Sequence, residues 1–483
     1  TALTAQNSLG VRHVELPSAE SVRESLRALD EDMRAQAIKI GMLGSAHVVR
    51  EVVEYLERSP CDAVVCDPVM VSSSGTPLVD AEGVRLIRER LLPRCRLVTP
   101  NIPEAEALLG RRILTPGDAE EAARDILRSM RCGAVLLKGG HGASSEVVQD
   151  VLCDGSNPPI WLTCARVGEA DGRGFHGTGC TLSSAIAALL ARNFDLLDAV
   201  VLAKAYVTQG ILHSQSVGTG PNPVAQTGWP RTDAAMPWIS RTAEHGSVRP
   251  KFARCDGDAA RGLLPVVSSS ELVARVVGAG ARDVQIRLKG LEPAVVAAEV
   301  RAAQNVCAAA GARLWVNDYW REALSAGAYG VHVGQEDLAL LTDGSESGWM
   351  ELEQLAASGL RLGISTHTFG ELAAALAVRP SYISIGPVFA TRSKSVTAAA
   401  AGPASTSSGA NTLVQPKGLG GVTDWRDLMP TDVPLIAIGG ITLEEAPSVL
   451  KAGAVGLAVI GAVVNSPDVK GAVRDWLSLW PNG

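Results

Sequence analysis

The segment 316–338, VNDYWREALSAGAYGVHVGQEDL, constrains the fold more than any other part of the chain. An apolar run ends in Asn317 and Asp318, a helical stretch rich in small residues follows, and a second apolar run ends shortly before Asp337. This pattern predicts a strand–helix–strand unit with an acidic residue just after each strand. Ligands of parallel α/β sheets bind at these carboxyl ends. Two neighbouring carboxylates there suit Mg2+, although a pair of helix caps would explain the same residues.

Apolar runs of strand length recur from this part of the chain to its end, and helical segments separate them. The eight runs cover residues 263–267, 283–288, 313–316, 329–333, 360–364, 382–385, 434–438 and 455–460. Eight alternating strands and helices in a segment of this length predict a TIM barrel. The active site of such a barrel lies in the loops that follow the strands, so the residues of those loops are the candidates.

The first part of the chain shows the same alternation and predicts a second α/β domain over residues 1–213, with a parallel sheet covered by helices. Residues 214–257 are dense in Gly, Pro, Ser and Thr and are expected to be a linker. Residues 395–421, rich in Ala, Ser and Gly, are expected to be an inserted loop. The barrel domain is then expected over residues 258–483.

Composition limits the kinds of partner. The formal net charge of -7 argues against binding to nucleic acid or to an anionic membrane surface. No apolar run reaches the length of a transmembrane helix. A phosphate site must therefore be built locally, from a few basic side chains, helix amino termini and a metal ion. The nine cysteines are an odd number without a C-x-x-C pair, which predicts reduced thiols.

Polar and glycine residues follow most of the predicted barrel strands. Gln285, Arg287 and Lys289 alternate along the second strand and so share one side of it. The later strand ends carry Asn317, Asp318, Asp337, Ser365, Thr391, Ser393, Lys394, Gly440, Ile460 and Gly461. Glycines at such ends let backbone N–H groups approach an anion. Each signal alone fits packing or surface position equally well, but together they predict a site for a diphosphate and a monophosphate.

The order of these motifs resembles that of the thiamine-phosphate synthases, from about residue 262 onward. The matching pieces are QIRLK, NDYW, GVHVGQEDL, GISTHT, IGPVFATRSK and AIGGIT. Members of that family join a pyrimidine methyl diphosphate to a thiazole phosphate and release pyrophosphate. The resemblance implies that no side chain acts as a nucleophile. Mg2+, Arg287, Lys289 and Lys394 would instead neutralise the charge that builds on the leaving group.

The same resemblance implies a role for each of the other candidates. Gln285, Arg287, Lys289 and Asn317 would hold the pyrimidine diphosphate, and Asp318 and Asp337 would bind Mg2+ with Ser365 nearby. Thr391 and Ser393 would contact the thiazole phosphate, Lys394 the diphosphate, and Gly440, Ile460 and Gly461 would form the phosphate cradle.

In the first domain, the sharpest signal is the glycine-rich segment 172–181, GRGFHGTGCT, which precedes an apolar helical stretch. A glycine-rich turn that opens a helix binds anions through unpaired N–H groups and the helix dipole. An ordinary tight turn with a small buried cysteine explains the segment on its own. Three further motifs follow apolar runs: DPVM at 67–70, TPN at 99–101 and KGGH at 138–141.

This set resembles the ribokinase-like hydroxymethylpyrimidine phosphate kinases, through TALTAQN, IKIGML, DPVM, TPNIPEAEAL, LLKGGH and HGTGCTLSSAIAA. The resemblance implies a ribokinase-like three-layer α/β domain that uses ATP, with the family's first strand and a glycine-rich substrate segment upstream of residue 1. It implies that Gln6 touches the pyrimidine, Cys180 replaces a carboxylate base, and Gly177, Thr178 and Gly179 form the anion hole. Asn101 and Glu104 would organise Mg2+ and its water, and Lys138 would contact nucleotide phosphate.

Together the resemblances imply a bifunctional enzyme of thiamine biosynthesis, in which the product of the kinase is the substrate of the synthase. One alternative is an active barrel with a kinase-like half that only docks or dimerises. Another is a different phosphate-binding barrel, such as an isomerase or aldolase, with a side chain acting as base. We expect small-molecule substrates and no nucleic-acid or membrane partner, and a homo-oligomer stays open. The expected location is the chloroplast for a plant or algal source, and the cytoplasm otherwise.

Overall fold

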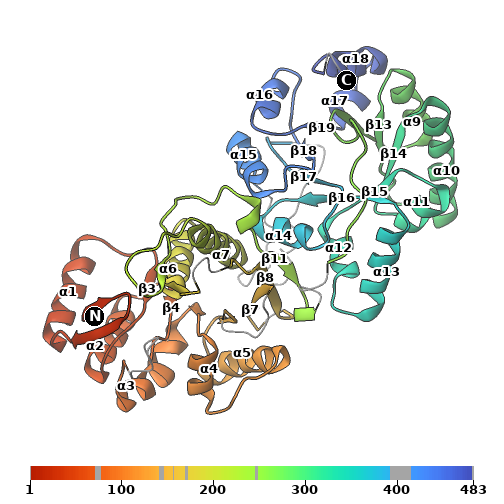
Figure 1. Cartoon of the computed structure of the whole chain (residues 1–483). Coiled ribbons are helices and arrows are strands. Elements are labelled where there is room, and N and C mark those ends of the chain that lie inside the picture. The colour runs from red at the N-terminus through yellow and green to blue at the C-terminus, as the bar shows by residue number, and fades with distance from the viewer. Residues whose placement is uncertain are drawn as a thin grey trace. The chain divides into compact units, whose positions relative to one another are not determined.

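The computed structural model describes residues 2–480 except 71–77, 141–145, 156, 169–171, 245–248 and 392–414. The described chain forms two compact α/β units (Figure 1). The first contains residues 2–230 and 234–244, and the second contains 231–233, 249–391 and 415–480. Within these ranges, no helix combines the length and the apolar character needed to cross a membrane.

A seven-stranded sheet forms the centre of the first unit, in the order β11-β8-β7-β6-β5-β4-β3. The strands are β3 (Ile38–Ile40), β4 (Val64–Cys66), β5 (Leu97–Val98), β6 (Val135–Lys138), β7 (Val147–Cys153), β8 (Ile160–Ala165) and β11 (Trp238–Ser240). Strands β3 to β6 are parallel, and β7, β8 and β11 continue the sheet in antiparallel pairs. The parallel strands are short and apolar because both of their faces are covered.

Helices cover both faces of this sheet. They are α1 (Ala19–Asp32), α2 (Ala46–Arg58), α3 (Ala81–Leu86), α4 (Ile102–Leu109), α5 (Pro116–Met130), α6 (Thr178–Ala191) and α7 (Leu196–Leu212). Side chains of α1 to α5 form one buried cluster with alternate strand residues such as Val64 and Val135. Val65 and Leu136 point to the opposite face, where α6 packs on β3 and β4 and against α7. The predicted three-layer α/β fold is confirmed.

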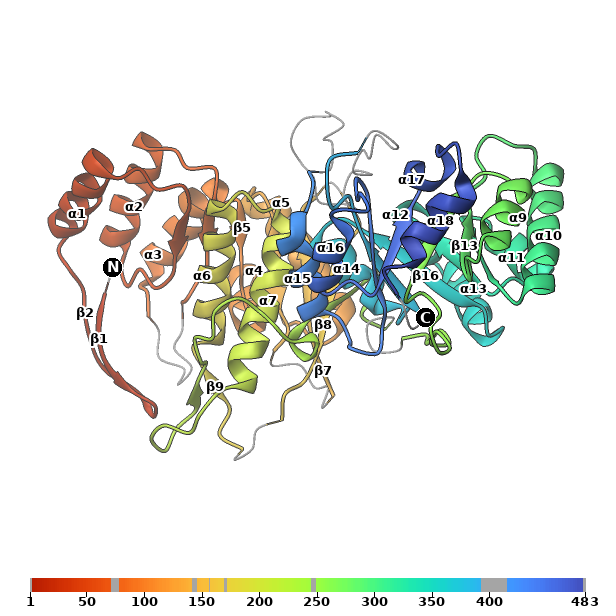
Figure 2. The same ribbon diagram turned by 90° about the horizontal axis from the view of Figure 1, so that it is seen from above.

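A hairpin of β1 (Leu3–Asn7) and β2 (Gly10–Glu15) forms a separate two-stranded sheet. Figure 2 shows it extending away from α1 and α2. The turn of the hairpin lies beside the loop that follows α7, because the backbone N–H of Gly220 donates to the hydroxyl of Ser8 at 3.3 Å. Gly220 is needed there, since an added Cβ would lie 2.0 Å from the carbonyl oxygen of Ser8.

The stretch 214–257 differs from the linker predicted from its composition. It contains β10 (Asn222–Pro223), which pairs with β9 (Phe175–His176), and β11, which is the edge strand of the central sheet. The end of the stretch is part of the barrel unit, where Phe252 is fully buried. The Pro and Gly residues therefore mark turns between short paired strands in this part of the chain, where the prediction was wrong.

The second unit is a closed barrel of eight parallel strands, and the TIM-barrel prediction is confirmed. The strands are β12 (Leu263–Val267), β13 (Asp283–Ile286), β14 (Arg313–Asn317), β15 (Gly330–Val333), β16 (Arg361–Thr366), β17 (Tyr382–Ile385), β18 (Leu435–Ile438) and β19 (Gly456–Val459). The barrel closes where β12 pairs with β19. Each of the eight apolar runs in the sequence overlaps one of these strands, and the ends differ by at most two residues.

Helices surround the barrel strands on the outside (Figure 1). They are α9 (Ser270–Gly278), α10 (Pro293–Ala310), α11 (Trp320–Ala326), α12 (Gln335–Leu341), α13 (Glu346–Ala357), α14 (Phe369–Ala377), α15 (Gly418–Leu428), α16 (Ala446–Lys451), α17 (Gly461–Val464) and α18 (Val469–Leu477).

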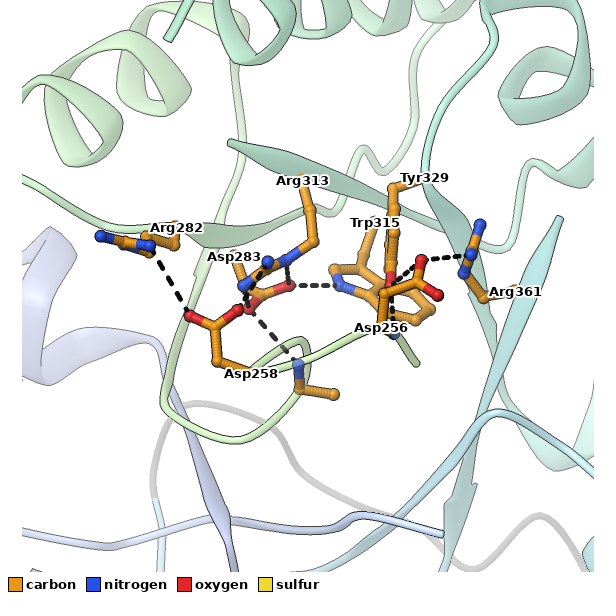
Figure 3. A network of polar contacts seen from close by, with 9 residues as sticks. Asp256, Asp258, Arg282, Asp283, Arg313, Trp315, Tyr329 and Arg361 are labelled. Carbon is orange, nitrogen blue, oxygen red and sulfur yellow. Dashed lines mark hydrogen bonds and ion pairs between the residues drawn. The ribbon is translucent and has the colours of Figure 1, made fainter. Parts of the chain in front are cut away.

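A buried carboxylate organises the amino-terminal face of the barrel (Figure 3). Asp283 accepts two hydrogen bonds from the Arg313 guanidinium, at 3.0 and 2.8 Å, and a third from Trp315 Nε1 at 3.0 Å. Arg313 also reaches Asp258, at 2.9 Å, in the segment that precedes β12. A buried charge is tolerated only when its lone pairs are used in this way, so this cluster ties the incoming chain to β13 and β14.

The same incoming segment contacts further strand beginnings. The backbone N–H of Asp256 donates to the Tyr329 hydroxyl at 3.0 Å, and its carboxylate pairs with Arg361 (Figure 3). The Arg361 guanidinium lies 4.3 Å from the centre of the Tyr329 ring. The hydroxyl of Ser381 donates to the carbonyl of Ala253 at 2.6 Å. Residues 252–260 therefore close the amino-terminal face of the barrel.

Aromatic rings fill the barrel lumen above this face. Trp315 and Tyr382 are fully buried and meet edge to face, with ring centres 4.8 Å apart. Glycines on the neighbouring strands make the room. A Cβ on Gly330 would lie 2.3 Å from the Trp315 ring, and a Cβ on Gly363 would lie 2.1 Å from the Tyr382 ring.

Replacing Gly363 with alanine should therefore destabilise the barrel by about 2–3 kcal/mol, because the added methyl group overlaps a ring that cannot move in a packed core. Gly262→Ala is the matched control, since its Cβ would meet no atom within 4 Å. Urea-dependent hydrogen exchange of peptides from β16 and β17 measures the change. Equal stabilities for the two variants would contradict the packing described here.

Candidate functional site

Two carboxylates meet at the ends of β14 and β15, as the sequence predicts. Asp318 follows β14 directly, and Asp337 lies in the first turn of α12 after β15. Asp318 has a left-handed backbone, φ 67°, which is uncommon outside glycine, and its N–H donates to the carbonyl of His332 at 2.8 Å. The ammonium group of Lys289 lies 2.5 Å from Asp318 Oδ2. The loop after β13 thus supplies one positive charge to the acidic pair.

The pKa of Asp337 is shifted by its surroundings, including the nearby Asp318. Burial, followed by the charge of Asp318, raises the pKa of Asp337 to about 6, and Lys289 opposes this shift. A pair that holds a proton at a pH so far above the ordinary value for Asp has too little positive charge around it. A divalent cation would supply that charge.

The donor set fits Mg2+, which takes oxygen ligands and keeps several of its waters. Among the described residues, no group of three or more His, Cys, Asp or Glu side chains is placed to hold a metal. Asp318 and Asp337 would therefore supply two protein ligands, and water and substrate phosphate oxygens would complete the coordination. That is how Mg2+ is bound in many phosphate-transfer sites.

Polar side chains surround the acidic pair. Gln285 and Asn317 are buried and contact each other at 3.4 Å between Nε2 and Oδ1. Gln335 donates to the carbonyl of Ser365 at 2.6 Å, which places the end of β16 beside the start of α12. Arg287 lies between Gln285 and Lys289 and is partly buried. The predicted residues of the second to fifth strand ends are therefore brought to one face of the barrel.

The predicted phosphate cradle forms a cavity of about 110 Å³ after β18 and β19. Thr391, Gly440, Ile460 and Gly461 line it together. Gly440 has φ 66°, and an added Cβ would lie 2.5 Å from the carbonyl oxygen of Ala390. Only glycine fits this turn, as a backbone that must approach an anion requires. Two other predicted site residues, Ser393 and Lys394, and the insert expected at 395–421 up to residue 414, lie outside the described residues.

In the first unit, the strand-end residues gather around a buried ion pair. Lys138 Nζ, at the end of β6, lies 2.7 Å from Asp67 Oδ1, which follows β4. The hydroxyl of Thr99 also donates to Asp67, at 3.3 Å, and that of Ser183 in α6 does so at 3.5 Å. Four segments distant in sequence therefore meet at the carboxyl ends of the parallel strands, where ligands of such sheets bind.

Asn101 and Glu104 form a reciprocal cap at the start of α4. The backbone N–H of Glu104 donates to Asn101 Oδ1, and that of Asn101 donates to Glu104 Oε2, both at 2.8 Å. Burial raises the pKa of Glu104 to about 7, although the charge of Lys138 favours the ionised form. The cap thus explains the spacing of Asn101 and Glu104. It uses Oε2 of Glu104, and Oε1 is not part of the cap.

The glycine-rich turn leads into α6 as the sequence predicts. Gly177 has φ 82°, and Thr178 and Gly179 are the first two residues of the helix. A Cβ on Gly179 would lie 3.0 Å from Lys138 Nζ, so the turn lies beside the buried ion pair. Cys180 is exposed in the first turn and lines a cavity of about 520 Å³.

Gln6 is the predicted site residue that lies apart from this cluster. It is exposed on β1, and none of the contacts among the described residues links it to Lys138 or Asp67.

Sequence reasoning assigned no role to Asp67 or to His332. Asp67 stood in a motif after an apolar run, and its partnership with Lys138 spans 71 residues. His332 is the one histidine within the apolar run of β15, where its side chain is buried. A buried ionisable residue inside a strand is the signal that could have marked it.

Both units thus have the build of enzymes that act on phosphorylated small molecules, with charged residues and glycine turns at the carboxyl ends of parallel strands. The phosphomethylpyrimidine kinase family model matches residues 1–225, and the thiamine monophosphate synthase model matches residues 265–463.

Two plant proteins match along nearly the whole chain. The probable thiamine biosynthetic bifunctional enzyme, chloroplastic, of Oryza sativa subsp. japonica is 32% identical over 488 residues, which cover 100% of this chain and 83% of the relative. The chloroplastic thiamine biosynthetic bifunctional enzyme of Arabidopsis thaliana is 32% identical over 470 residues, 96% of this chain and 83% of the relative. The thiamine-phosphate synthase of Cronobacter sakazakii is 41% identical over 218 residues, 45% of this chain and 91% of the relative. The chain belongs to the family of bifunctional thiamine biosynthetic enzymes.

The raised pKa of Asp337 predicts how stability depends on pH. The folded state binds this proton more readily than the unfolded chain, in which the pKa is about 3.9, so ionised Asp337 costs stability above pH ~6. Asp337→Asn should therefore stabilise the metal-free protein at pH 7.5, by on the order of 1 kcal/mol once solvent screening of the half-exposed group is allowed for. The gain should shrink as the pH falls from 6 to 4.

Thermal unfolding in EDTA at several pH values measures this effect. Asp475→Asn, at an exposed position on α18, is the control. A gain for Asp337→Asn that does not depend on pH would show that the ionisation of Asp337 is not its cause.

Proposed function

We propose that this chain makes thiamine phosphate in two steps. The first unit phosphorylates hydroxymethylpyrimidine phosphate with ATP, and the barrel joins the resulting diphosphate to a thiazole phosphate. The observation that carries this proposal is the Lys289–Asp318–Asp337 cluster, in a chain that matches bifunctional relatives from end to end. The family membership supports both activities, and the product of the first is the substrate of the second.

In the barrel, Asp318 and Asp337 would hold Mg2+, and the ion would supply positive charge to the diphosphate. Gln285 and Asn317 contact the pyrimidine diphosphate, with Ser365 on the adjacent strand end. Arg287, Lys289 and Lys394 stabilise the departing pyrophosphate. Support for these roles comes from the contacts of Gln285 with Asn317 and of Lys289 with Asp318 at the carboxyl ends of β13 and β14.

The reaction exchanges one bond at the pyrimidine methylene carbon. The C–O bond to the diphosphate breaks and pyrophosphate leaves with the electron pair. The thiazole ring nitrogen then forms the new C–N bond to the resulting pyrimidine-stabilised cation. Thr391, Ser393, Gly440, Ile460 and Gly461 hold the phosphate of the thiazole. The glycine-lined cavity is supporting evidence, because backbone groups approach an anion most closely there.

In the first unit, Cys180 is the base for the attacking substrate oxygen, and Gly177, Thr178 and Gly179 form the anion hole for the transferred phosphoryl group. Lys138 contacts nucleotide phosphate, with Asp67 holding its ammonium group in place. Asn101 and Glu104 would organise Mg2+ and its water, and Gln6, which lies apart from these residues on the hairpin, would contact the pyrimidine. These parts position the substrates and neutralise charge, which is most of what phosphoryl transfer needs.

The substrates on this proposal are small-molecule thiamine precursors and ATP. The two plant relatives are named chloroplastic. We place this chain in the chloroplast if its source is a plant or alga, and in the cytoplasm otherwise.

Asp318→Asn tests the synthase assignment. Thiamine phosphate formation from the supplied diphosphate and thiazole phosphate should fall by at least about 100-fold, because one metal ligand and the charge that pairs with Lys289 are lost. Kinase activity should be unchanged, and Asp475→Asn should affect neither step. Coupling at the normal rate in Asp318→Asn would remove the acidic pair from the mechanism.

Cys180→Ala tests the kinase assignment, and because Cys180 is exposed, the substitution leaves the packed core unchanged. ATP-dependent phosphorylation of hydroxymethylpyrimidine phosphate should fall by about 100-fold or more, as general-base catalysis is lost. Coupling of supplied diphosphate should continue. Cys61→Ala, which removes a thiol that is not part of the proposed site, is the control and should retain kinase activity. If the unaltered protein consumes no ATP with this substrate yet still couples, the first unit is a docking or dimerisation module.

A further inference from the structure

His332 connects two strand ends of the synthase site from inside the barrel. It lies on β15, in register with Asn317 of β14 on one side and Gly363 of β16 on the other. Its backbone carbonyl accepts from the N–H of Asp318 at 2.8 Å. Its imidazole reaches the other way, where Nε2 lies 2.7 Å from the hydroxyl of Ser365. One buried residue thus touches both a proposed metal ligand and a proposed substrate contact.

The second ring nitrogen of His332 is held by Tyr382. The phenol oxygen lies 2.7 Å from Nδ1, and the two rings are stacked with centres 5.6 Å apart. Tyr382 is fully buried and fits only because Gly363 has no side chain. Burial also raises the pKa of this phenol well above its usual value, so its proton stays in place.

The direction of these hydrogen bonds follows because the buried O–H of Tyr382 requires an acceptor. Among the described residues, His332 Nδ1 is the acceptor within reach of the Tyr382 O–H. If Nδ1 carried the hydrogen instead, the phenol proton would be buried without an acceptor, which costs free energy. Tyr382 therefore donates to Nδ1, and the hydrogen of the neutral imidazole is on Nε2.

This tautomer determines what Ser365 can do. Nε2–H donates to Ser365 Oγ, and the hydroxyl of Ser384 approaches the same oxygen at 3.5 Å. Ser365 Oγ thus accepts from the barrel interior, and its own hydrogen is left to donate elsewhere. In the opposite tautomer, the hydrogen of Ser365 would be used on Nε2.

We propose that His332 and Tyr382 are positioning residues of the synthase, which hold Ser365 so that its hydroxyl donates to an acceptor atom of the bound pyrimidine diphosphate. The inference rests on the proposed coupling reaction in the barrel. Neither residue touches substrate, so both act through Ser365. Their effect on the rate should therefore vanish when the Ser365 hydroxyl is absent.

A double-mutant cycle tests this dependence. Tyr382→Phe keeps the ring in the lumen and removes the donor, and should lower kcat for coupling about tenfold, with KM for thiazole phosphate unchanged. Ser365→Ala should lower kcat at least as much. Adding Tyr382→Phe to Ser365→Ala should have no further effect. Urea-dependent hydrogen exchange of peptides from β16 and β17 is the control for folding of the barrel in every variant.

His332 variants give an independent comparison. His332→Gln keeps an amide donor for Ser365 and should retain more activity than His332→Leu, which has none. Additive losses for Tyr382→Phe and Ser365→Ala, or full activity in either one, would overturn the proposal. Absence of coupling by the unaltered protein would instead overturn the proposed function.

An NMR measurement tests the His332–Tyr382 proposal separately from the proposed function, because it does not depend on enzymatic activity. In 15N-labelled protein, the ring signals of His332, assigned by their loss in His332→Gln, should report hydrogen on Nε2 at pH 7.5. Tyr382→Phe should mix the two tautomers. Hydrogen on Nδ1 in the unaltered protein would overturn the proposed hydrogen-bond direction.

Discussion

Two like charges held close together at the barrel mouth are the constraint on which the synthase site depends. Burial and the charge of Asp318 make the ionised form of Asp337 less favourable and raise its pKa to about 6. The left-handed turn at Asp318, bonded to the carbonyl of His332, keeps the first carboxylate in place. Lys289 offsets part of the repulsion. On the proposed function, a divalent cation would supply the positive charge that this acidic pair lacks.

That packing extends through the whole height of the barrel. Asp283 at the amino-terminal face binds the indole of Trp315, whose ring packs against Tyr382, whose hydroxyl binds His332 near the mouth. Gly363 leaves room for this column, and no larger residue could stand in its place. Close-packed interiors resist small displacements, so the strand ends are held by contacts well below them. The positions of the site residues therefore depend on the packing of the barrel lumen as well as on the loops.

The fold and the site differed in how far the sequence could predict them. Barrel strands buried on both faces read as continuous apolar runs, and the residues after them face the mouth because parallel strands end together. His332 was missed because one histidine in an apolar run looks like a core residue until its partners are known. The edge strand β11 (Trp238–Ser240) was missed because its pairing with β8 is non-local and its surroundings are rich in Pro and Gly. Asp67 pairs with Lys138, which lies 71 residues further along the chain, so no local sequence pattern could predict the pair.

The closing segment 252–260 also has an architectural consequence. The polypeptide enters the barrel at the amino-terminal face, through Asp256 and Asp258, while Asp318 and Asp337 lie at the opposite end of the strands. Residues 252–260 therefore contact the barrel at the end of the strands opposite to the proposed substrate site. A barrel separated from the rest of the chain must keep Phe252 and the residues after it, because they form its amino-terminal floor.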